Sequence, residues 1–202
     1  MTNQSNRTAV ITGAGDGIGR ALAINHNSRG IDLYLCDIDR ERLDATAGML
    51  NRDGVTVSTA VVDCGNREQI ETWAKMICAE NDSLDFLFNN AGVGYASPFR
   101  DASLENFEWL MNINYWGVVW STKAFLPLLE ASTAGHLVNI SSIFGMVGIA
   151  TQSAYNSAKF AVRGFTESLQ AEYWDSALTV TCVHPGGIAT NIALRARTDG
   201  EA

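Results

Sequence analysis

The chain is poor in the residues that build metal centres and disulfide frameworks. Its 202 residues include only three histidines and four cysteines. The histidines are scattered, so no metal site is predicted. The cysteines show neither paired nor metal-type spacing, and we interpret them as reduced thiols in or near the core of a cytoplasmic protein. They are Cys36, Cys64, Cys78 and Cys182.

Long hydrophobic runs and breaks in regular structure are also scarce. No stretch approaches the ~18 consecutive apolar residues of a membrane helix, so no membrane span is expected. The first residues, MTNQSNR, are polar and lack the apolar core of a secretory signal. There are only three prolines, and no repeat, low-complexity tract or linker is visible. This pattern favours a single domain over residues 1–202.

The chain has fewer basic than acidic residues. The formal net charge is −8, with 14 lysines and arginines against 22 acidic residues. Such a surface repels phosphate backbones and anionic lipid, which argues against partners of either kind.

Apolar runs that are typical of buried strands alternate with amphipathic, helix-like segments. This alternation predicts an α/β protein with a doubly wound parallel sheet of the Rossmann type. Ligands of such sheets bind beyond the carboxyl ends of the strands, here at the switch point between the first and fourth strands. The six predicted strands span residues 8–12, 31–37, 55–63, 84–88, 136–141 and 178–183. The predicted helices span about 20–29, 39–51, 66–80, 103–130 with a bend or break near Pro127, and 151–174.

A glycine-rich turn follows the first strand. Strand, glycine turn and helix is the context in which such glycines bring the backbone close to a ligand. The helix N-terminus then offers free N–H groups and a positive dipole end to a pyrophosphate. The alternative is a purely structural turn. The turn reads Gly13, Ala14, Gly15, Asp16, Gly17, Ile18 and Gly19.

Asp37 closes the second strand, eighteen residues past Gly19. An acidic residue at this place can accept hydrogen bonds from an adenosine ribose, and it would repel a 2′-phosphate. The alternative, a helix cap, suits Asp39 better than Asp37.

Tyr155 and Lys159 lie four residues apart in a predicted helix, so both side chains share one face. A fixed ammonium beside a phenol favours the phenolate and lowers the phenol pKa. Ser142, at the end of the fifth predicted strand, can donate to a substrate oxygen. Together they form a proton-transfer site for an alcohol or a carbonyl. Alone, such a pair is more often a surface tyrosine and a solvated lysine.

These motifs give the chain a resemblance to the short-chain dehydrogenases/reductases, in their compact, non-extended branch. The resemblance covers nearly the whole chain and follows the family's order of motifs. The matching segments are Thr12-Gly13-x-x-x-Gly17-x-Gly19, Asn89-Asn90-Ala91-Gly92, Asn114, Ser142, Tyr155-x-x-x-Lys159 and Pro185-Gly186.

The resemblance implies an NAD(H)-dependent oxidoreductase that exchanges a hydride between nicotinamide and substrate. It implies that Tyr155 is the general acid/base, that Lys159 lowers the phenol pKa and binds the nicotinamide ribose, that Ser142 polarises the carbonyl, and that Asn114 holds a water. The further cofactor contacts that it implies are Asp63 and Cys64 at the adenine, Asn90, Ala91 and Gly92 along the adenosine ribose, Pro185 and Gly186, and Ile188 and Thr190 near the carboxamide.

NAD is expected over NADP. Asp37 favours NAD, and where NADP-dependent members often carry a basic residue before the second motif glycine, this chain has Asp16. Arg40 could reach a 2′-phosphate, but a solvated helix arginine is the simpler interpretation.

The chain stops several dozen residues earlier than family members commonly do. Residues 186–202 are expected to begin a mobile substrate loop, and the lid region, a further strand and its helix are expected to be missing. This keeps open a non-catalytic or impaired nucleotide-binding relative. A dehydratase or epimerase of the same fold is a second alternative, but such enzymes usually belong to the longer branch.

Apolar residues near the predicted site favour a lipophilic alcohol or carbonyl substrate. They are Phe144, Met146, Val147 and Ile149. Aromatic residues on the helix predicted at 103–130, and the way similar proteins pair this helix with the Tyr155 helix, lead us to expect a homodimer or homotetramer.

Overall fold

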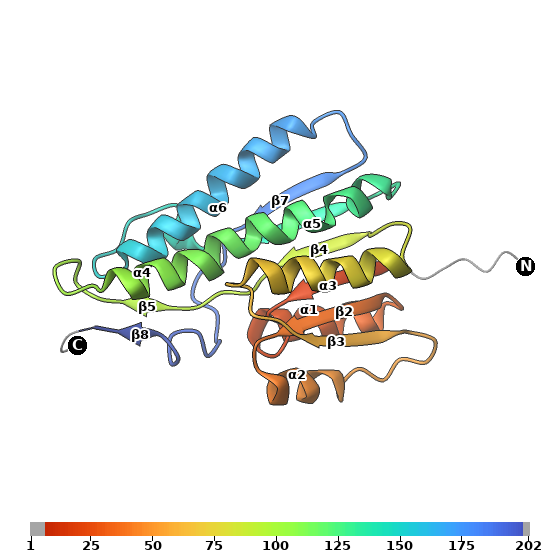
Figure 1. Cartoon of the computed structure of the whole chain (residues 1–202), viewed down its shortest axis with the longest axis horizontal. Coiled ribbons are helices and arrows are strands. Elements are labelled where there is room, and N and C mark those ends of the chain that lie inside the picture. Colours follow the sequence, from red (N-terminus) through yellow and green to blue (C-terminus); the bar gives the residue numbers. More distant parts are fainter. Residues whose placement is uncertain (1–6, 200–202) are drawn as a thin grey trace, which may run out of the picture.

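A parallel six-stranded sheet forms the centre of the molecule in a computed structural model, which describes residues 7–199 (Figure 1). The strand order is β3-β2-β1-β4-β6-β7, so the order reverses between β1 and β4, as the sequence predicts. The strands are β1 (Thr8–Thr12), β2 (Asp32–Asp37), β3 (Val57–Val61), β4 (Phe86–Asn89), β6 (His136–Ile140) and β7 (Thr179–Val183). Each predicted strand is present, with ends shifted by at most two residues.

Helices cover both faces of the sheet, and alternate strand residues divide between two cores. Val10 packs with α3, α5 and α6, whereas its neighbour Ile11 packs on the side of α1 and α2. This alternation is the two-residue period of a strand that is buried on both faces. The helices are α1 (Gly17–Ser28), α2 (Arg40–Ala47), α3 (Arg67–Glu80), α4 (Leu104–Met111), α5 (Gly117–Ala131) and α6 (Ser153–Glu172).

The long helix predicted at 103–130 is divided, but not at its proline. A π-helical stretch, η1 (Asn112–Trp116), joins α4 to α5, while α5 continues unbroken through Pro127. A break near Pro127 is therefore wrong, and the bend expected there as the alternative stays a prediction. The irregular turn lies instead around Asn114, one of the predicted site residues.

A second, two-stranded sheet lies at the carboxyl end of the main one (Figure 1). It pairs β5 (Tyr95–Ala96) with β8 (Arg197–Thr198), two segments whose pairing no sequence pattern predicts. A short 3-10 helix, η2 (Ile143–Gly145), follows β6. None of the helices within residues 7–199 is long and apolar enough to span a bilayer.

Candidate active site

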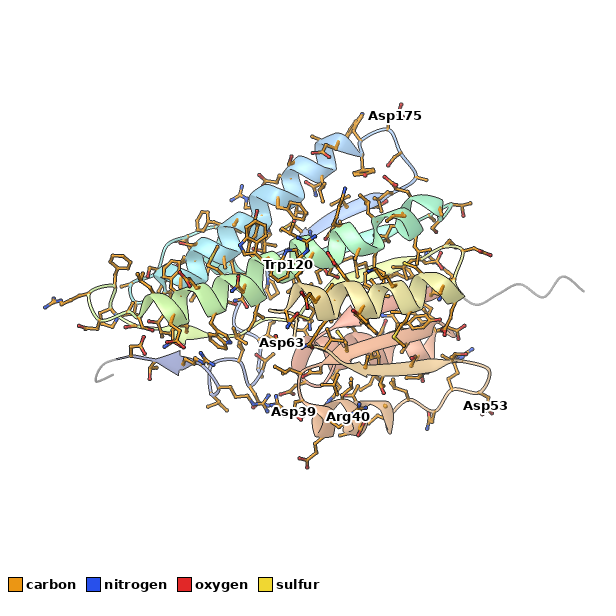
Figure 2. All side chains as sticks on the ribbon, viewed as in Figure 1. Asp39, Arg40, Asp53, Asp63, Trp120 and Asp175 are labelled. Atoms are coloured by element: carbon orange, nitrogen blue, oxygen red, sulfur yellow. The ribbon has the colours of Figure 1, made fainter. Side chains whose placement is uncertain are left out.

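A cavity of about 450 Å³ opens at the carboxyl ends of β1, β2, β4 and β6. Its walls include the glycine turn after β1, the loop after β4 and the Tyr155 face of α6. Asp39 and Asp63 lie at this end of the sheet, while Asp53 and Asp175 lie at the opposite end (Figure 2). The predicted residues that line the cavity are Gly13, Asp16, Gly17, Ile18, Asp37, Asp63, Cys64, Asn90, Ala91, Gly92, Ser142, Tyr155, Lys159, Pro185, Gly186, Ile188 and Thr190.

Gly19 and Asn114 do not line the cavity, and both stand directly behind it. A Cβ on Gly19 would overlap the Gly13 carbonyl oxygen, so α1 can approach the turn only with glycine here. Gly13 has φ +65°, a conformation that suits glycine. Asn90 donates from Nδ2 to the Thr12 and Gly13 carbonyl oxygens at 3.0 and 3.1 Å, and so braces the turn.

Asp37 occupies the predicted place at the end of β2. Its Oδ2 accepts from the Gly15 N–H at 2.9 Å, and its Oδ1 accepts from the Asp39 N–H at 3.0 Å. These two bonds fix the carboxylate at the edge of the glycine turn, facing the cavity. Asp39 itself caps α2 by accepting from the Arg42 N–H at 3.0 Å, so the division of roles expected from the sequence is confirmed for Asp39.

Asn114 is fully buried in η1 and holds the loop after β4. Its Oδ1 accepts from the Val93 N–H at 2.8 Å, and its Nδ2 donates to the Val93 carbonyl oxygen at 2.9 Å. A Cβ placed on Gly92 would lie 3.3 Å from Asn114 Oδ1 and 3.6 Å from Lys159 Nζ. Gly92 therefore separates the asparagine from the lysine by little more than one atomic layer.

Tyr155 and Lys159 face the cavity from the first two turns of α6. The Lys159 ammonium lies 5.7 Å from the centre of the Tyr155 ring and donates to the Ile140 carbonyl oxygen at 2.9 Å. The Ser142 hydroxyl oxygen accepts from the Phe144 N–H at 3.1 Å, and Ser142 lies close enough to the Tyr155 hydroxyl to act against the rise of its pKa. The phenol, the ammonium and the hydroxyl thus share one wall.

Burial changes the acid–base properties of this pair. Burial raises the pKa of Tyr155, and the Ser142 hydrogen bond offsets only part of that rise. Burial also lowers the pKa of Lys159 to about 8, since water no longer solvates the ammonium. Loss of solvation is thus the largest influence on the phenol here, and the lowering of its pKa expected from Lys159 stays a prediction.

The segment after β7 contributes cavity residues that the sequence did not reveal. Asn191 and Arg195 both donate to Asp16 Oδ2, at 2.7 and 2.9 Å. The Asp16 carboxylate also caps α1 by accepting from the Gly17 N–H at 2.8 Å. No local motif signals these contacts, since they join positions about 175 residues apart. The cavity residues not predicted are Ile38, Arg42, Val62, Val93, Gly94, Trp109, Ile113, Ile140, Ser141, Asn191, Ile192, Arg195 and Arg197.

Residues 186–199 pass over the mouth of the cavity and end on α4. Asp199 accepts from Tyr95 Oη at 2.5 Å, from the Ser103 N–H at 2.9 Å and from Asn106 Nδ2 at 2.9 Å. These three bonds lower the pKa of Asp199 to about 2. The mobility expected for 186–202 stays a prediction, and its last three residues lie outside the described part of the chain.

The apolar residues expected near the predicted site do not line the cavity. Met146, Val147 and Ile149 are 55%, 47% and 42% exposed and do not line the cavity, and Phe144 packs edge-on against Tyr155 at 6.0 Å. The apolar lining comes instead from other elements. It includes Val62, Val93, Trp109, Ile113, Ile188 and Ile192. Within residues 7–199, no three His, Cys, Asp or Glu side chains are grouped to hold a metal ion.

Comparison with known proteins gives one consistent result. Residues 7–201 match a family model described as short chain dehydrogenase. SadH of Mycobacterium tuberculosis, named as a candidate oxidoreductase, is 43% identical over 204 residues, which cover 100% of this chain and 74% of SadH. Some relatives are much longer, and the chain spans only 31% of one of them.

Solved structures agree with the sequence comparison. A short chain dehydrogenase/reductase from Burkholderia phymatum, in complex with NAD, superposes with a TM-score of 0.89 at 31% identity, over 96% of this chain and 70% of that one. An alcohol dehydrogenase from Thermococcus sibiricus, complexed with 5-hydroxy-NADP, gives 0.87 at 29% identity, over 98% and 83%.

Proposed function

The chain belongs to the short-chain dehydrogenase family, and from that membership we propose that it is an NAD-dependent oxidoreductase that interconverts an alcohol and a carbonyl compound. The observation that carries the proposal is one cavity lined both by the glycine turn and by Tyr155, Lys159 and Ser142. The turn offers main-chain N–H groups at the α1 N-terminus for a dinucleotide diphosphate. The hydroxyls of Tyr155 and Ser142 serve the substrate oxygen at the other end.

Each polar side chain at that end has a defined task. A bound nicotinamide supplies the hydride acceptor or donor. During oxidation the Tyr155 phenolate takes the hydroxyl proton of the alcohol, and during reduction the phenol returns a proton to the carbonyl oxygen. Ser142 donates to the same oxygen. Lys159, one helical turn away, would favour the charged phenolate and hold the nicotinamide ribose.

The side chains at the adenosine end support NAD. Asp37 presents a carboxylate where a 2′-phosphate would lie, and the repulsion disfavours NADP. The two arginines that line this end are already paired with carboxylates, Arg42 with Asp39 at 2.6 Å and Arg195 with Asp16 at 2.9 Å. Since one of the solved relatives carries NAD and the other an NADP derivative, the choice for this chain rests on Asp37.

Replacing Asp37 with alanine should reduce the preference for NADH over NADPH by about tenfold, because the repulsion of the 2′-phosphate disappears. Titration of both cofactors, followed by the fluorescence of the five tryptophans, measures the two Kd values. Since Asp37 also holds the Gly15 N–H, both affinities should fall, and the ratio is the informative quantity. Asp53→Ala, at the far end of the sheet (Figure 2), should leave the ratio unchanged. An unaltered ratio in Asp37→Ala would contradict this role.

The cavity walls support a lipophilic substrate. Val93, Trp109, Ile113 and Ile192 present apolar surface to the cavity that Tyr155 faces, and burying such surface favours binding of an apolar group. Turnover of aliphatic, steroid and sugar alcohols at equal concentration tests this. Faster turnover of the polyols would contradict it.

We also propose that the chain forms at least a homodimer through the side that carries α5 and α6. Trp116, at the end of η1, is 43% exposed, and Phe160 on α6 is 42% exposed. Large aromatic side chains of this kind are enriched at protein interfaces. Light scattering at micromolar concentration should give at least twice the mass of one chain. A monomer would contradict the proposal.

The location proposed for the protein is the cytoplasm. All four cysteines are free thiols in the structure, and such thiols persist in reducing compartments.

A further inference from the structure

An acidic side chain stands at the point where the proposed function places a diphosphate. Asp16 caps the N-terminus of α1, and its Oδ1 accepts from the Gly17 N–H at 2.8 Å. Helix N-termini attract anions through their free N–H groups and the helix dipole. A carboxylate at the same place competes for that attraction and repels a second anion. A positive group that offsets Asp16 would therefore favour the binding of a dinucleotide here.

Arg195 is placed to do this. Its Nη1 lies 2.9 Å from Asp16 Oδ2, and Asn191 Nδ2 donates to the same oxygen at 2.7 Å. These bonds lower the pKa of Asp16, the Asn191 bond having the largest effect, so the carboxyl stays ionised. Both Arg195 and Asn191 line the cavity together with Gly13 and Gly17.

The contact is part of a chain segment that lies over the cavity. At Thr190 the segment packs on the glycine turn so closely that a Cβ on Gly17 would lie 3.0 Å from Thr190 Cγ2. Beyond Arg195 the segment is fixed again. The guanidinium carbon of Arg197 lies 3.6 Å from the centre of the Trp109 ring, and Arg197 in β8 pairs with Tyr95 in β5. Arg195 is thus held over the turn from both sides, although its own side chain is 45% exposed.

We propose that Arg195 is a positioning residue for dinucleotide binding: it neutralises Asp16 and so allows the diphosphate to approach the N-terminus of α1. This rests on the proposed function. Arg195 acts by offsetting the negative charge of Asp16. The affinity for the cofactor therefore depends on a residue outside the glycine turn.

The decisive experiment is a double-mutant cycle read by NADH titration of the full chain. Arg195→Gln leaves Asp16 without its counter-charge and should raise the Kd for NADH about fivefold to tenfold at low ionic strength. Adding Asp16→Asn removes the repulsion and keeps a good N-cap residue. The double variant should therefore return to within about twofold of the unaltered chain. A Kd for Arg195→Gln within twofold of the unaltered chain, or no recovery in the double variant, would overturn the proposal.

Two further variants separate charge from packing. Arg195→Lys keeps the positive charge and should bind NADH nearly as well as the unaltered chain. A loss as large as that of Arg195→Gln would overturn the proposal. Arg40→Gln removes a positive charge from the exposed pair with Asp44 on α2 (Figure 2), and it should change the Kd by less than about twofold.

Ionic strength supplies an independent readout. The Arg195→Gln effect should shrink toward unity at 1 M salt, where the Debye length is about 3 Å. An effect that does not depend on salt would overturn the charge-based role. If the unaltered chain fails to bind NADH, the proposed function fails and this inference with it. Normal binding by the unaltered chain with an unchanged Arg195→Gln overturns the inference alone.

Discussion

Tyr155→Phe is expected to lower kcat by about 10²–10⁴-fold while the Kd for NADH stays within about twofold. Phenylalanine keeps the ring, which packs edge-on against Phe144 at 6.0 Å and against the cluster of Tyr95 and Leu110. Only the hydroxyl is lost, and with it the group that moves the proton to or from the substrate oxygen. Steady-state turnover and tryptophan fluorescence titration measure the two quantities separately.

The pH dependence gives this prediction a second readout. Since burial raises the pKa of Tyr155, the phenol is mostly protonated at neutral pH. Alcohol oxidation by the unaltered chain should speed up as the pH rises and the phenol ionises. This rise should be absent in Tyr155→Phe.

Tyr173→Phe is the matched control. It removes a tyrosine hydroxyl just beyond the other end of α6, where the hydroxyl donates to Glu130 at 2.7 Å. Turnover should not change. If Tyr155→Phe instead lost cofactor affinity and turnover in equal measure, the tyrosine would be structural. Retained NADH binding without turnover in the unaltered chain would favour the non-catalytic alternative.

Local sequence signals were enough to predict the sheet, and the family resemblance supplied many of the cavity residues. The run at 8–12 is apolar and β-branched, so it indicates a buried strand, and β1 spans those same residues. The order of strands then determines which loops meet, because parallel strands place their carboxyl ends together. Asp37 and Ser142 were located in this way and Tyr155 by its helical spacing to Lys159, and all three line the cavity.

Features that depend on distant contacts were missed. Asp199 meets Tyr95 and Ser103 across about 100 positions of sequence, and no periodicity encodes that meeting. The pairing of β5 with β8 is only two residues long on each side, too short to leave an alternating pattern. The sequence of residues 186–199 shows none of these contacts, because the side chains that receive them lie far away in sequence.

The break in the long helix was misplaced for a related reason. Proline is the usual sign of a kink, and Pro127 was therefore the natural candidate. The π-helical turn is instead placed where Asn114 must reach the Val93 main chain. π-Helical turns are frequent at functional sites, but their cause is tertiary contact, which the sequence of the helix alone does not show.

Electrostatics of the buried pair could not be predicted from spacing. A helical turn places Lys159 near Tyr155, and that proximity favours the phenolate. The cost of removing both groups from water depends on the surrounding packing. Lys159 is 3% exposed, so this cost is large enough to lower its own pKa to about 8.

Lys159→Met should therefore make the protein more stable while it disables the site. Keeping the ammonium charged in the core at neutral pH costs on the order of 3 kcal/mol, as judged from the lowered pKa. Methionine has a similar length and no charge. It cannot replace the hydrogen bond from Lys159 to the Ile140 carbonyl oxygen, and losing that bond costs about 1 kcal/mol. We expect a net gain of about 1–2 kcal/mol in the free energy of unfolding at pH 7. In the same Lys159→Met variant, kcat should fall by about 10²-fold or more, and NADH binding should weaken.

The pH dependence of the gain identifies its cause. Between pH 8 and 10.5, the unfolded chain keeps the proton on Lys159 while the folded chain releases it, so the unaltered protein becomes more stable as the pH rises. The advantage of Lys159→Met should be complete below pH 8, shrink through this window and vanish near its upper limit. Urea unfolding at pH 7 and pH 10, at one protein concentration, measures the difference. Lys75→Met, which alters an exposed lysine on α3, should show neither the gain nor its decline. A Lys159→Met variant that is less stable at pH 7, by an amount that does not vary with pH, would mean that the lysine acts in the fold through packing and hydrogen bonding, with no penalty for its charge.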